Sequence, residues 1–583
     1  MTLAARPTPG EMVGRGPIAV GLYAEPRRRA PPSQAAPPGS VSDCPAPAAR
    51  SPLGDLATLQ LSPSCETGST IPAMRKPSQR RLSGGPEAKR TVYVLSGQGA
   101  LGALMCLTLS CGCGRQAGHA DDSPPAAAYN IVLVSIDTLR ADHLGCYGYF
   151  RDTSPEIDAF ARESIFFEQA YAPMATTLPS HASLLTAVHP REHGVLANVG
   201  DGGRPFVSTE KLRSFAQVAK ANGYATVAFV SATPLKKPYC GLDVGFDLYD
   251  QPPRSERRAA ATTSNVIAWL ERTPQQPFFL MVHYYDPHNP YQPPPPYDRM
   301  YQSDAALERF LAQRQIPDSV EPGQCKGTKV TVTRDVTNLY DGEIRYTDAE
   351  IGRLFEKLRS LGQWERSVIV LTADHGEGLN QHDWPKHGRV WNEQLHVPLM
   401  IRFPKELAGG LPQRVPALVS LIDVLPTVLG RVTPAWAATF LAQASGVDVL
   451  APGFVERPIV AQRSARECGG NEGPAYALTT PEWRFHYFKR GGHMLFDRRL
   501  DPHELTNVFG SAGAVAEQML ALERTLVGAL KSRGKELTAG VAARVASLPP
   551  EIAREMEALG YTGESGTAAE EPNQPTSGPA SQP

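Results

Sequence analysis

The sequence predicts an α/β fold with a large, mostly parallel sheet flanked by helices and a smaller C-terminal α+β domain. From Tyr129 onward, short apolar segments of strand length alternate with amphipathic segments typical of helices. The apolar segments are continuous, as expected for parallel strands that helices cover on both faces. A segment near residue 484 has the pattern of two antiparallel strands followed by a helix.

Four segments have the length and composition of buried strands. They are Asn130–Ile136, Ala225–Ala232, Pro277–Tyr285 and Ser367–Ala373. A helix-like segment precedes the second and another precedes the fourth, as in β-α-β units, whose strands pair in parallel. Pro287–Val330 is rich in proline and poor in apolar runs, which indicates an excursion over the surface.

The chain of 583 residues is too long for one ordinary domain. Changes in composition predict four parts. Residues 1–127 form a disordered leader, 128–450 the large α/β domain, 451–562 a C-terminal subdomain and 563–583 a disordered tail. The C-terminal subdomain contains the strand pair in Arg484–Val508 and the helix Ala514–Arg533.

The leader contains a candidate export signal near residues 89–113. Basic residues that end at Arg90 precede the apolar segment Ala100–Ser110, and Cys111 follows it. The segment is too short for a comfortable membrane span. We therefore expect export to the periplasm or cell envelope, with Cys111 as a candidate lipid anchor and the only membrane attachment. Met74 is an alternative start, and an ordinary apolar segment in a non-native leader is the alternative interpretation.

The net charge and the spacing of the cysteines argue against three kinds of protein: nucleic-acid-binding, cysteine-ligated metal-binding and disulfide-rich. The net charge is −1, so the composition argues against a nucleic-acid partner. Nine cysteines are present, but five of them precede Gly114 and the others are scattered. They form no metal-type pair beyond the leader and no disulfide framework.

Polar residues follow the predicted strands at the points where ligands gather in parallel sheets. Asp137 ends the first strand, His288 follows the third, and Asp374 and His375 end the fourth. Thr177 lies where TTLPSHASLL begins a helix. Two carboxylates, an imidazole and a hydroxyl form a suitable shell for a divalent metal ion, and the helix N-terminus favours a tetrahedral anion. Each residue alone has a simpler interpretation as a turn, cap or solvated residue.

Several longer segments resemble the sulfatase branch of the alkaline phosphatase superfamily. They occur in the expected order between Asn130 and Val508, with a further family-like segment near Met556. The matching segments are NIVLVSIDTLRADHLGCYGY, TSPEIDAFARESIFFEQAYA, TLPSHASLLTAVHPREHGV, YDPHNPY, TADHGEGLNQH, KHG, SLIDVLPTVLG and LFDRRLDPHELTNV. The resemblance implies a large α/β domain, a smaller C-terminal domain and hydrolysis of sulfate or phosphate-type esters.

The sequence departs from the sulfatase pattern at the residues that carry the family's chemistry. Sulfatases have C-x-P-S-R or S-x-P-S-R, whose first residue is oxidised to formylglycine, but here Thr177 and His181 occupy the first and last positions. A threonine cannot give that aldehyde because its Cβ bears a methyl group. Thr138 stands where a second aspartate is usual, and His387 stands where a lysine is expected.

The departures resemble the one-metal site of lipoteichoic acid synthases and phosphoethanolamine transferases. This resemblance implies Asp137, Thr177, Asp374 and His375 as metal ligands and Thr177 as the nucleophile. The metal ion would make the hydroxyl easier to deprotonate. His288 or His387 would protonate the leaving oxygen. Either water or a second alcohol would then accept the transferred group.

The histidine among the ligands favours one zinc or manganese ion, with calcium as the alternative. Three further residues are second-tier candidates for the pocket: His181, Asn198 and His382.

Three functions remain in competition. The first is a metal-dependent hydrolase of sulfate or phosphate-type esters, acting on a small-molecule, glycan or lipid ester. The second is a transferase that moves a phospho group onto cell-envelope glycans or lipids. The third is a catalytically silent binding protein on the same scaffold, which the four ligand-type residues argue against.

Overall fold

The computed structural model describes residues 129–200, 202–272, 277–321, 330–464, 475–541, 549–552 and 554. The predicted leader with its export segment and the predicted tail lie outside these residues. Among the helices in these ranges, none is both long and apolar enough to cross a membrane.

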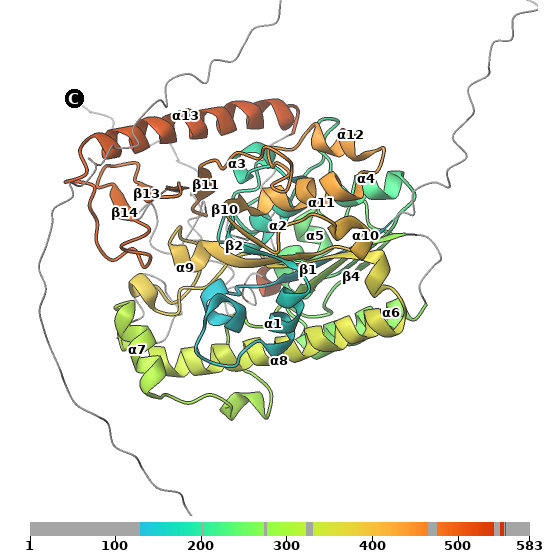
Figure 1. Ribbon diagram of the computed structural model, residues 1–583, viewed down its shortest axis with the longest axis horizontal. Helices are drawn as coiled ribbons and strands as arrows, with labels where there is room; N and C mark the ends of the chain where they lie inside the picture. Colours follow the sequence, from blue (N-terminus) through green and yellow to red (C-terminus); the bar gives the residue numbers. More distant parts are fainter. Residues whose placement is uncertain are drawn as a thin grey trace, which may run out of the picture. The chain divides into compact units, whose positions relative to one another are not determined.

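A sheet of eight strands forms the centre of the described chain (Figure 1). Its strand order is β10-β2-β9-β8-β1-β5-β3-β4. The strands are β1 (Asn130–Ile136), β2 (Ile165–Tyr171), β3 (Ala225–Phe229), β4 (Leu248–Asp250), β5 (Phe278–Tyr284), β8 (Ser367–Ala373), β9 (His396–Arg402) and β10 (Arg414–Ser420).

The sheet is mostly parallel, which confirms the prediction. β1 pairs in parallel with β5 and β8, and β3 pairs in parallel with β4 and β5. Only β9, among the described strands of this sheet, runs antiparallel to its neighbours β2 and β8. The carboxyl ends of β1, β5 and β8 therefore lie side by side at one edge.

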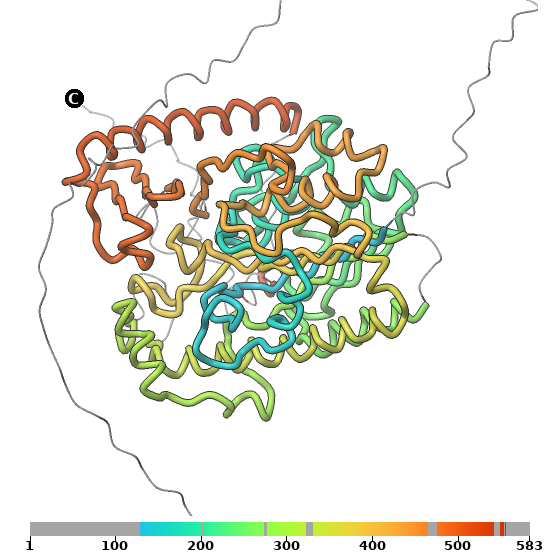
Figure 2. The backbone as a smooth tube through the Cα atoms, in the orientation of Figure 1, coloured from blue at the N-terminus to red at the C-terminus, as the bar shows by residue number. Residues whose placement is uncertain are grey.

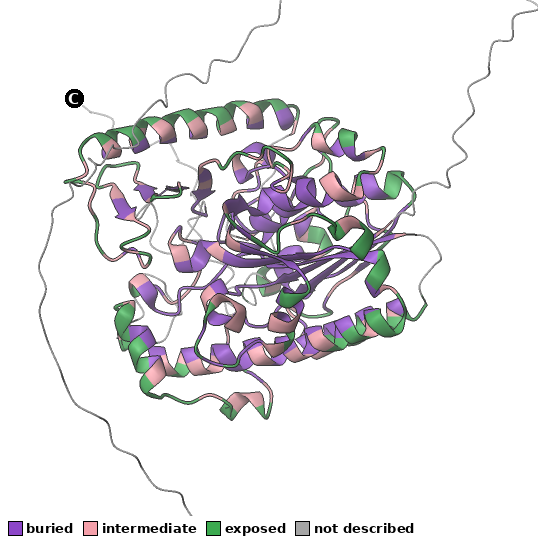
Figure 3. Ribbon diagram, viewed as in Figure 1, coloured by how far each residue is buried: buried purple, intermediate pink, exposed green. Residues whose placement is uncertain are grey.

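Helices cover both faces of the sheet (Figures 1 and 2). One face carries α1 (Pro155–Arg162), α6 (Ala259–Leu270) and the long α8 (Thr333–Ser360), which contacts both of the others. The other face carries α2 (Thr177–Thr186), α4 (Phe215–Ala221), α11 (Val424–Val432) and α12 (Ala437–Leu441). The strands are buried almost throughout, as Figure 3 shows.

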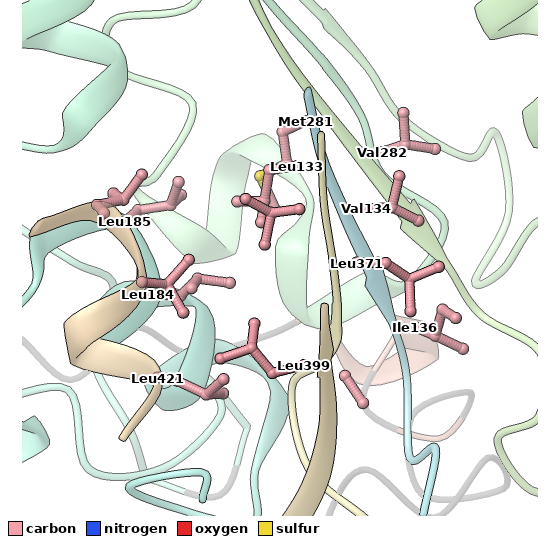
Figure 4. Packing of buried hydrophobic residues seen from close by; sticks show 14 of the residues in the cluster. Leu133, Val134, Ile136, Leu184, Leu185, Met281, Val282, Leu371, Leu399 and Leu421 are labelled. Carbon is pink, nitrogen blue, oxygen red and sulfur yellow. The ribbon is translucent and has the colours of Figure 1, made fainter. Parts of the chain in front are cut away.

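Alternate residues of each strand pack against the two helical layers (Figure 4). Leu133 of β1 points to the side of Leu184 and Leu185 of α2, and Val134 points to the opposite side. All four side chains are fully buried. This double-sided burial explains why the strands have continuous apolar sequences rather than alternating ones.

The region predicted as a surface excursion contains regular structure. Its main element is α7 (Ala305–Gln313), which begins where Asp304 accepts hydrogen bonds from the N–H groups of Ala306 and Leu307. Leu307 and Phe310 of this helix pack with Tyr149 in a small separate cluster. The prolines at its start obscured the short helical period.

A second, antiparallel sheet and a long helix follow the main domain, as predicted. The sheet contains β11 (Ile459–Gln462), β12 (Tyr476–Thr479), β13 (Trp483–Tyr487) and β14 (Met494–Asp497). Helix α13 (Ala514–Leu537) contacts β13 and also α3 (Pro190–His193) of the main domain. The subdomain thus has its own small apolar core and packs against the main domain.

Candidate active site

Asp137, Asp374 and His375 come together at the carboxyl edge of the main sheet. Asp137 directly follows β1, and Asp374 and His375 directly follow β8. Nε2 of His375 lies 3.8 Å from Oδ1 of Asp137 and 3.5 Å from Oδ2 of Asp374. All three side chains are fully buried. The β1–β8 pairing, in register from Asn130↔Ser367 to Ile136↔Ala373, brings these strand ends together.

Thr177 is the first residue of α2, as the sequence predicts. The first turn of this helix is fastened to the end of β8, because Oγ of Ser180 donates a hydrogen bond of 2.6 Å to the Asp374 carbonyl. The Thr177 side chain is fully buried, and its hydroxyl makes no hydrogen bond to any described residue. The helix N-terminus beside it favours a bound anion.

The hydrogen bonds around the site leave selected atoms open to a metal ion. Oδ1 of Asp374 accepts from the N–H groups of His375 and Thr138, whereas Oδ2 has no hydrogen-bond partner within the described chain. Nδ1 of His375 donates to the Gly376 carbonyl at 2.9 Å, which leaves the lone pair on Nε2. A buried carboxylate oxygen, an imidazole nitrogen and a hydroxyl without protein partners fit a divalent cation.

The electrostatics of the site also favour a bound divalent cation. Burial, and then the charge of Asp137, raise the pKa of Asp374 well above its ordinary value. Burial lowers the pKa of His375 to about 3, so the ring is neutral and has a lone pair to give. A bound cation would offset the repulsion between the two carboxylates.

His288 and His387 meet beside this cluster. Their Nε2 atoms lie 3.3 Å apart, and the His387 ring lies 4.5 Å from the His375 ring, centre to centre. Nδ1 of His288 donates to the Asn289 carbonyl, and Nδ1 of His387 donates to the Ala175 carbonyl. The structure therefore brings both predicted proton donors to the predicted metal ligands.

A comparison with known protein families identifies the family to which this fold belongs. Residues 129–433, more than half of the chain, match the model of the family described as Sulfatase. The chain belongs to the sulfatase family.

Curated and solved relatives of this sulfatase-family chain carry several activities in their names. An arylsulfatase of Clostridium perfringens is 25% identical over 480 residues, which cover 70% of this chain and 96% of the relative. The multifunctional alkaline phosphatase superfamily protein PehA of Trinickia caryophylli is 23% identical, covering 66% of this chain and 92% of the relative. The phosphonate monoester hydrolase of Agrobacterium radiobacter shares the fold, with a TM-score of 0.53, 20% identity and coverage of 70% and 96%.

Two of the second-tier residues lie next to the cluster. His181, in the position of the sulfatase arginine, has Nδ1 3.6 Å from Oδ2 of Asp374. Oδ1 of Asn198 accepts a hydrogen bond of 3.0 Å from the N–H of Leu178, at the start of α2. Asn198 therefore caps the helix that carries Thr177.

The third, His382, has other neighbours. Its Nδ1 lies 3.3 Å from Oε1 of Glu393, and its ring stacks on Trp391 at 3.8 Å. Its Nε2 faces the Glu504 carbonyl of the C-terminal subdomain at 3.4 Å. These contacts belong to a buried ion-pair cluster rather than to the predicted metal ligands.

Two further residues of this sulfatase-family site were not predicted from the sequence. His283 lies inside β5, with Nε2 3.6 Å from Oδ2 of Asp137. Glu377 is buried just after His375, and burial, together with the charge of Asp137, raises its pKa to about 8. A polar residue inside an otherwise apolar strand is the one signal that could have indicated His283.

Proposed function

We propose that this protein is a metal-dependent hydrolase of sulfate or phosphate-type esters that uses the Thr177 hydroxyl as its nucleophile. The single observation that carries the proposal is the buried Thr177 hydroxyl, which has no hydrogen-bond partner in the described chain and lies at the start of a helix whose first turn is hydrogen-bonded to the Asp374 carbonyl through Ser180. The names of the relatives agree with this class, since they include sulfatases and a phosphonate monoester hydrolase.

Asp137, Asp374, His375 and Thr177 are the proposed metal ligands. A divalent ion held by them would lower the pKa of the threonine hydroxyl and offset charge on the ester oxygens. The imidazole ligand favours zinc or manganese over calcium. The N-terminus of α2 adds its positive end at the same place, where negative charge develops in the transition state.

The proposed reaction has two stages. The Thr177 oxygen bonds to the sulfur or phosphorus as the bond to the leaving oxygen breaks, and the hydroxyl proton passes to solvent. The leaving oxygen takes a proton from the His288–His387 pair. Water then cleaves the threonine ester, releases the acid and restores the hydroxyl, while the histidine pair regains its proton from solvent.

The histidine pair is arranged to hold one proton between its two rings. The carbonyls of Asn289 and Ala175 can only accept hydrogen bonds, so each Nδ1 carries a hydrogen. In two neutral rings, both Nε2 lone pairs would then face each other across 3.3 Å. A single added proton turns this repulsion into a hydrogen bond and makes the pair a source of one proton.

The test is a substrate panel with the full chain. We would remove metal with a chelator, reload zinc, manganese or calcium, and assay 4-nitrophenyl sulfate, 4-nitrophenyl phosphate, bis(4-nitrophenyl) phosphate and a phosphonate monoester. We expect turnover that requires metal, falls to background in Thr177→Ala and persists in part in Thr177→Ser. Full activity in Thr177→Ala would mean that the nucleophile is another group.

A phospho-group transferase is the second candidate, because the threonine-based ligand set resembles that of enzymes whose threonine carries a phospho group. Product analysis with and without an added alcohol separates the two. A phosphorylated alcohol in place of free phosphate would identify the transferase.

A further inference from the structure

Tyr340 contacts the turn that follows Asp137. It belongs to α8, on one face of the main sheet (Figure 1), and its side chain is fully buried. Its hydroxyl donates a hydrogen bond of 2.7 Å to the carbonyl of Thr138 and accepts one of 2.9 Å from the backbone N–H of Arg140. A single side-chain oxygen therefore joins two parts of the turn after β1.

This turn contains a residue in an unfavourable backbone conformation. Thr138 has a φ of +54°, in the left-handed region that β-branched residues rarely adopt. The residue before it, Asp137, still has its N–H paired with the Tyr284 carbonyl of β5 at 2.9 Å. The chain thus leaves the sheet abruptly at Thr138. A strained conformation of this kind persists only where the surrounding contacts enforce it.

The turn directs a backbone donor toward the candidate site. The N–H of Thr138 donates a hydrogen bond of 3.3 Å to Oδ1 of Asp374. The same oxygen accepts from the N–H of His375 at 2.8 Å. Because Thr138 directly follows Asp137, its backbone conformation sets how the carboxylates of Asp137 and Asp374 lie relative to each other.

The neighbours of Tyr340 hold its ring in place. The rings of His143 and Tyr291 pack edge-on against it, with centroid distances of 5.1 and 5.6 Å. Nδ1 of His143 lies 2.8 Å from Oδ1 of Asp341, the next residue of α8. The phenol hydroxyl is therefore a fixed point against which the turn is held.

We propose that Tyr340 is a positioning residue of the candidate active site, whose hydroxyl holds Thr138 in its left-handed conformation and so keeps Asp137 and Asp374 in place. The proposal rests on the proposed function, in that these two carboxylates serve the reaction. Tyr340 acts through the backbone of the turn. Without its hydroxyl, a buried carbonyl and a buried N–H lose their partner, and the turn relaxes.

The first test compares two phenylalanine variants of the full chain. Tyr147 is the matched control, because its hydroxyl also donates to a carbonyl, that of Phe167 at 2.7 Å, and accepts from an N–H, that of Leu399 at 3.0 Å. It joins β2 to β9, two strands that carry none of the candidate site residues.

The two variants should differ in their kinetics. The probe is 4-nitrophenyl sulfate or bis(4-nitrophenyl) phosphate, whichever the wild type hydrolyses faster. Tyr340→Phe should lower kcat and kcat/KM together by about 10- to 100-fold, because misplaced carboxylates serve the transition state less well. Tyr147→Phe should keep the kinetic constants of the wild type.

A variant of the turn itself separates strain from the simple loss of a contact. Glycine adopts a left-handed conformation without strain, so Thr138→Gly makes the turn less dependent on Tyr340. In the Thr138→Gly background, Tyr340→Phe should lower kcat by a smaller factor than it does in the wild type. An equal or larger factor would show that the hydroxyl does not act by holding Thr138.

Hydrogen exchange followed by mass spectrometry gives a readout that needs no activity. Tyr340→Phe should speed amide exchange in residues 137–141, because the N–H of Arg140 loses its acceptor. Tyr147→Phe should leave this segment unchanged. Unaltered exchange or an unaltered kcat in Tyr340→Phe would overturn the inference alone. A wild type that hydrolyses neither probe would count against the proposed function, and the exchange rates would still decide whether Tyr340 holds the turn.

Discussion

Nδ1 of His382 lies 3.3 Å from Oε1 of Glu393, in a buried cluster where the main domain meets the C-terminal strands. Glu504 belongs to the same cluster, which also contains Arg484 of β13. Burial opposes a charge on the ring, but the carboxylates of Glu393 and then Glu504 outweigh it and raise the pKa of His382 to about 9.

This ion pair predicts a loss of stability at alkaline pH. Because the pKa of His382 is higher in the folded state than its ordinary 6.5, its contribution is complete below pH 6.5 and is lost as the pH rises through 9. Across that window we expect the free energy of unfolding to fall by up to about 3 kcal/mol. Urea unfolding at several pH values would measure it, and His382→Gln should remove this part of the pH dependence.

Metal binding should stabilise the fold. A cation between Asp137 and Asp374 offsets their repulsion and binds only the folded chain, so zinc at 100 times its Kd adds about 2.7 kcal/mol to the free energy of unfolding. Thermal unfolding with a chelator and with zinc would show this as a higher Tm in zinc. Asp374→Asn should lose the shift, whereas an unchanged shift in that variant would contradict the proposed ligand set.

The His288–His387 pair should matter most for esters with poor leaving groups. Replacing either histidine with glutamine should lower kcat/KM for an alkyl ester about 100- to 10,000-fold, because the leaving oxygen then lacks its proton source. The same variants should lose far less with 4-nitrophenyl esters, whose leaving group departs unprotonated. An equal loss for both ester types would argue against the role of proton donor.

Position 376, next to His375, has no room for a side chain because the backbone of Glu393 packs closely against it. A Cβ at this position would lie 2.1 Å from the Glu393 carbonyl oxygen. We therefore expect Gly376→Ala to displace His375, whose Nδ1 donates to the Gly376 carbonyl, and to weaken zinc affinity about 10-fold or more. Zinc titration tests this, with Gly409→Ala as the control because nothing lies within 4 Å of its added Cβ.

Leu184 packs α2 against the sheet, and its side chain is fully buried. Leu184→Ala should lower the free energy of unfolding by about 2–5 kcal/mol through lost burial and the remaining cavity. Leu500→Ala, at a side chain that is 85% exposed, should change it by less than about 0.5 kcal/mol. Urea unfolding of both variants makes the comparison.

The sequence predicted the elements that depend on local pattern. β1 and β8 have the predicted bounds because their continuous apolar runs end at polar residues. Thr177 begins α2 as expected. The candidate ligands could be named because parallel strands place their carboxyl ends at one edge.

Other features depend on contacts between segments that are far apart in the sequence. The local sequence pattern carries no information about such contacts. β9 runs antiparallel within the main sheet, and its direction is set by pairing with β2 and β8. His283 joins the site only because β5 lies beside β1. His382 looked like a pocket residue by its closeness in sequence to His375, but Glu393 and Glu504 hold it elsewhere.

The packing around His181 limits how this chain could become a formylglycine enzyme. Changing Thr177 to cysteine would restore the first residue of the sulfatase motif, but the motif also ends in arginine. A guanidinium at position 181 would have to fit where Ser135, Asp374 and His283 already enclose the ring, with all of these side chains fully buried. An arginine at position 181 would therefore need accompanying changes on α2, β1 and β5, so Thr177→Cys alone would not rebuild the sulfatase motif.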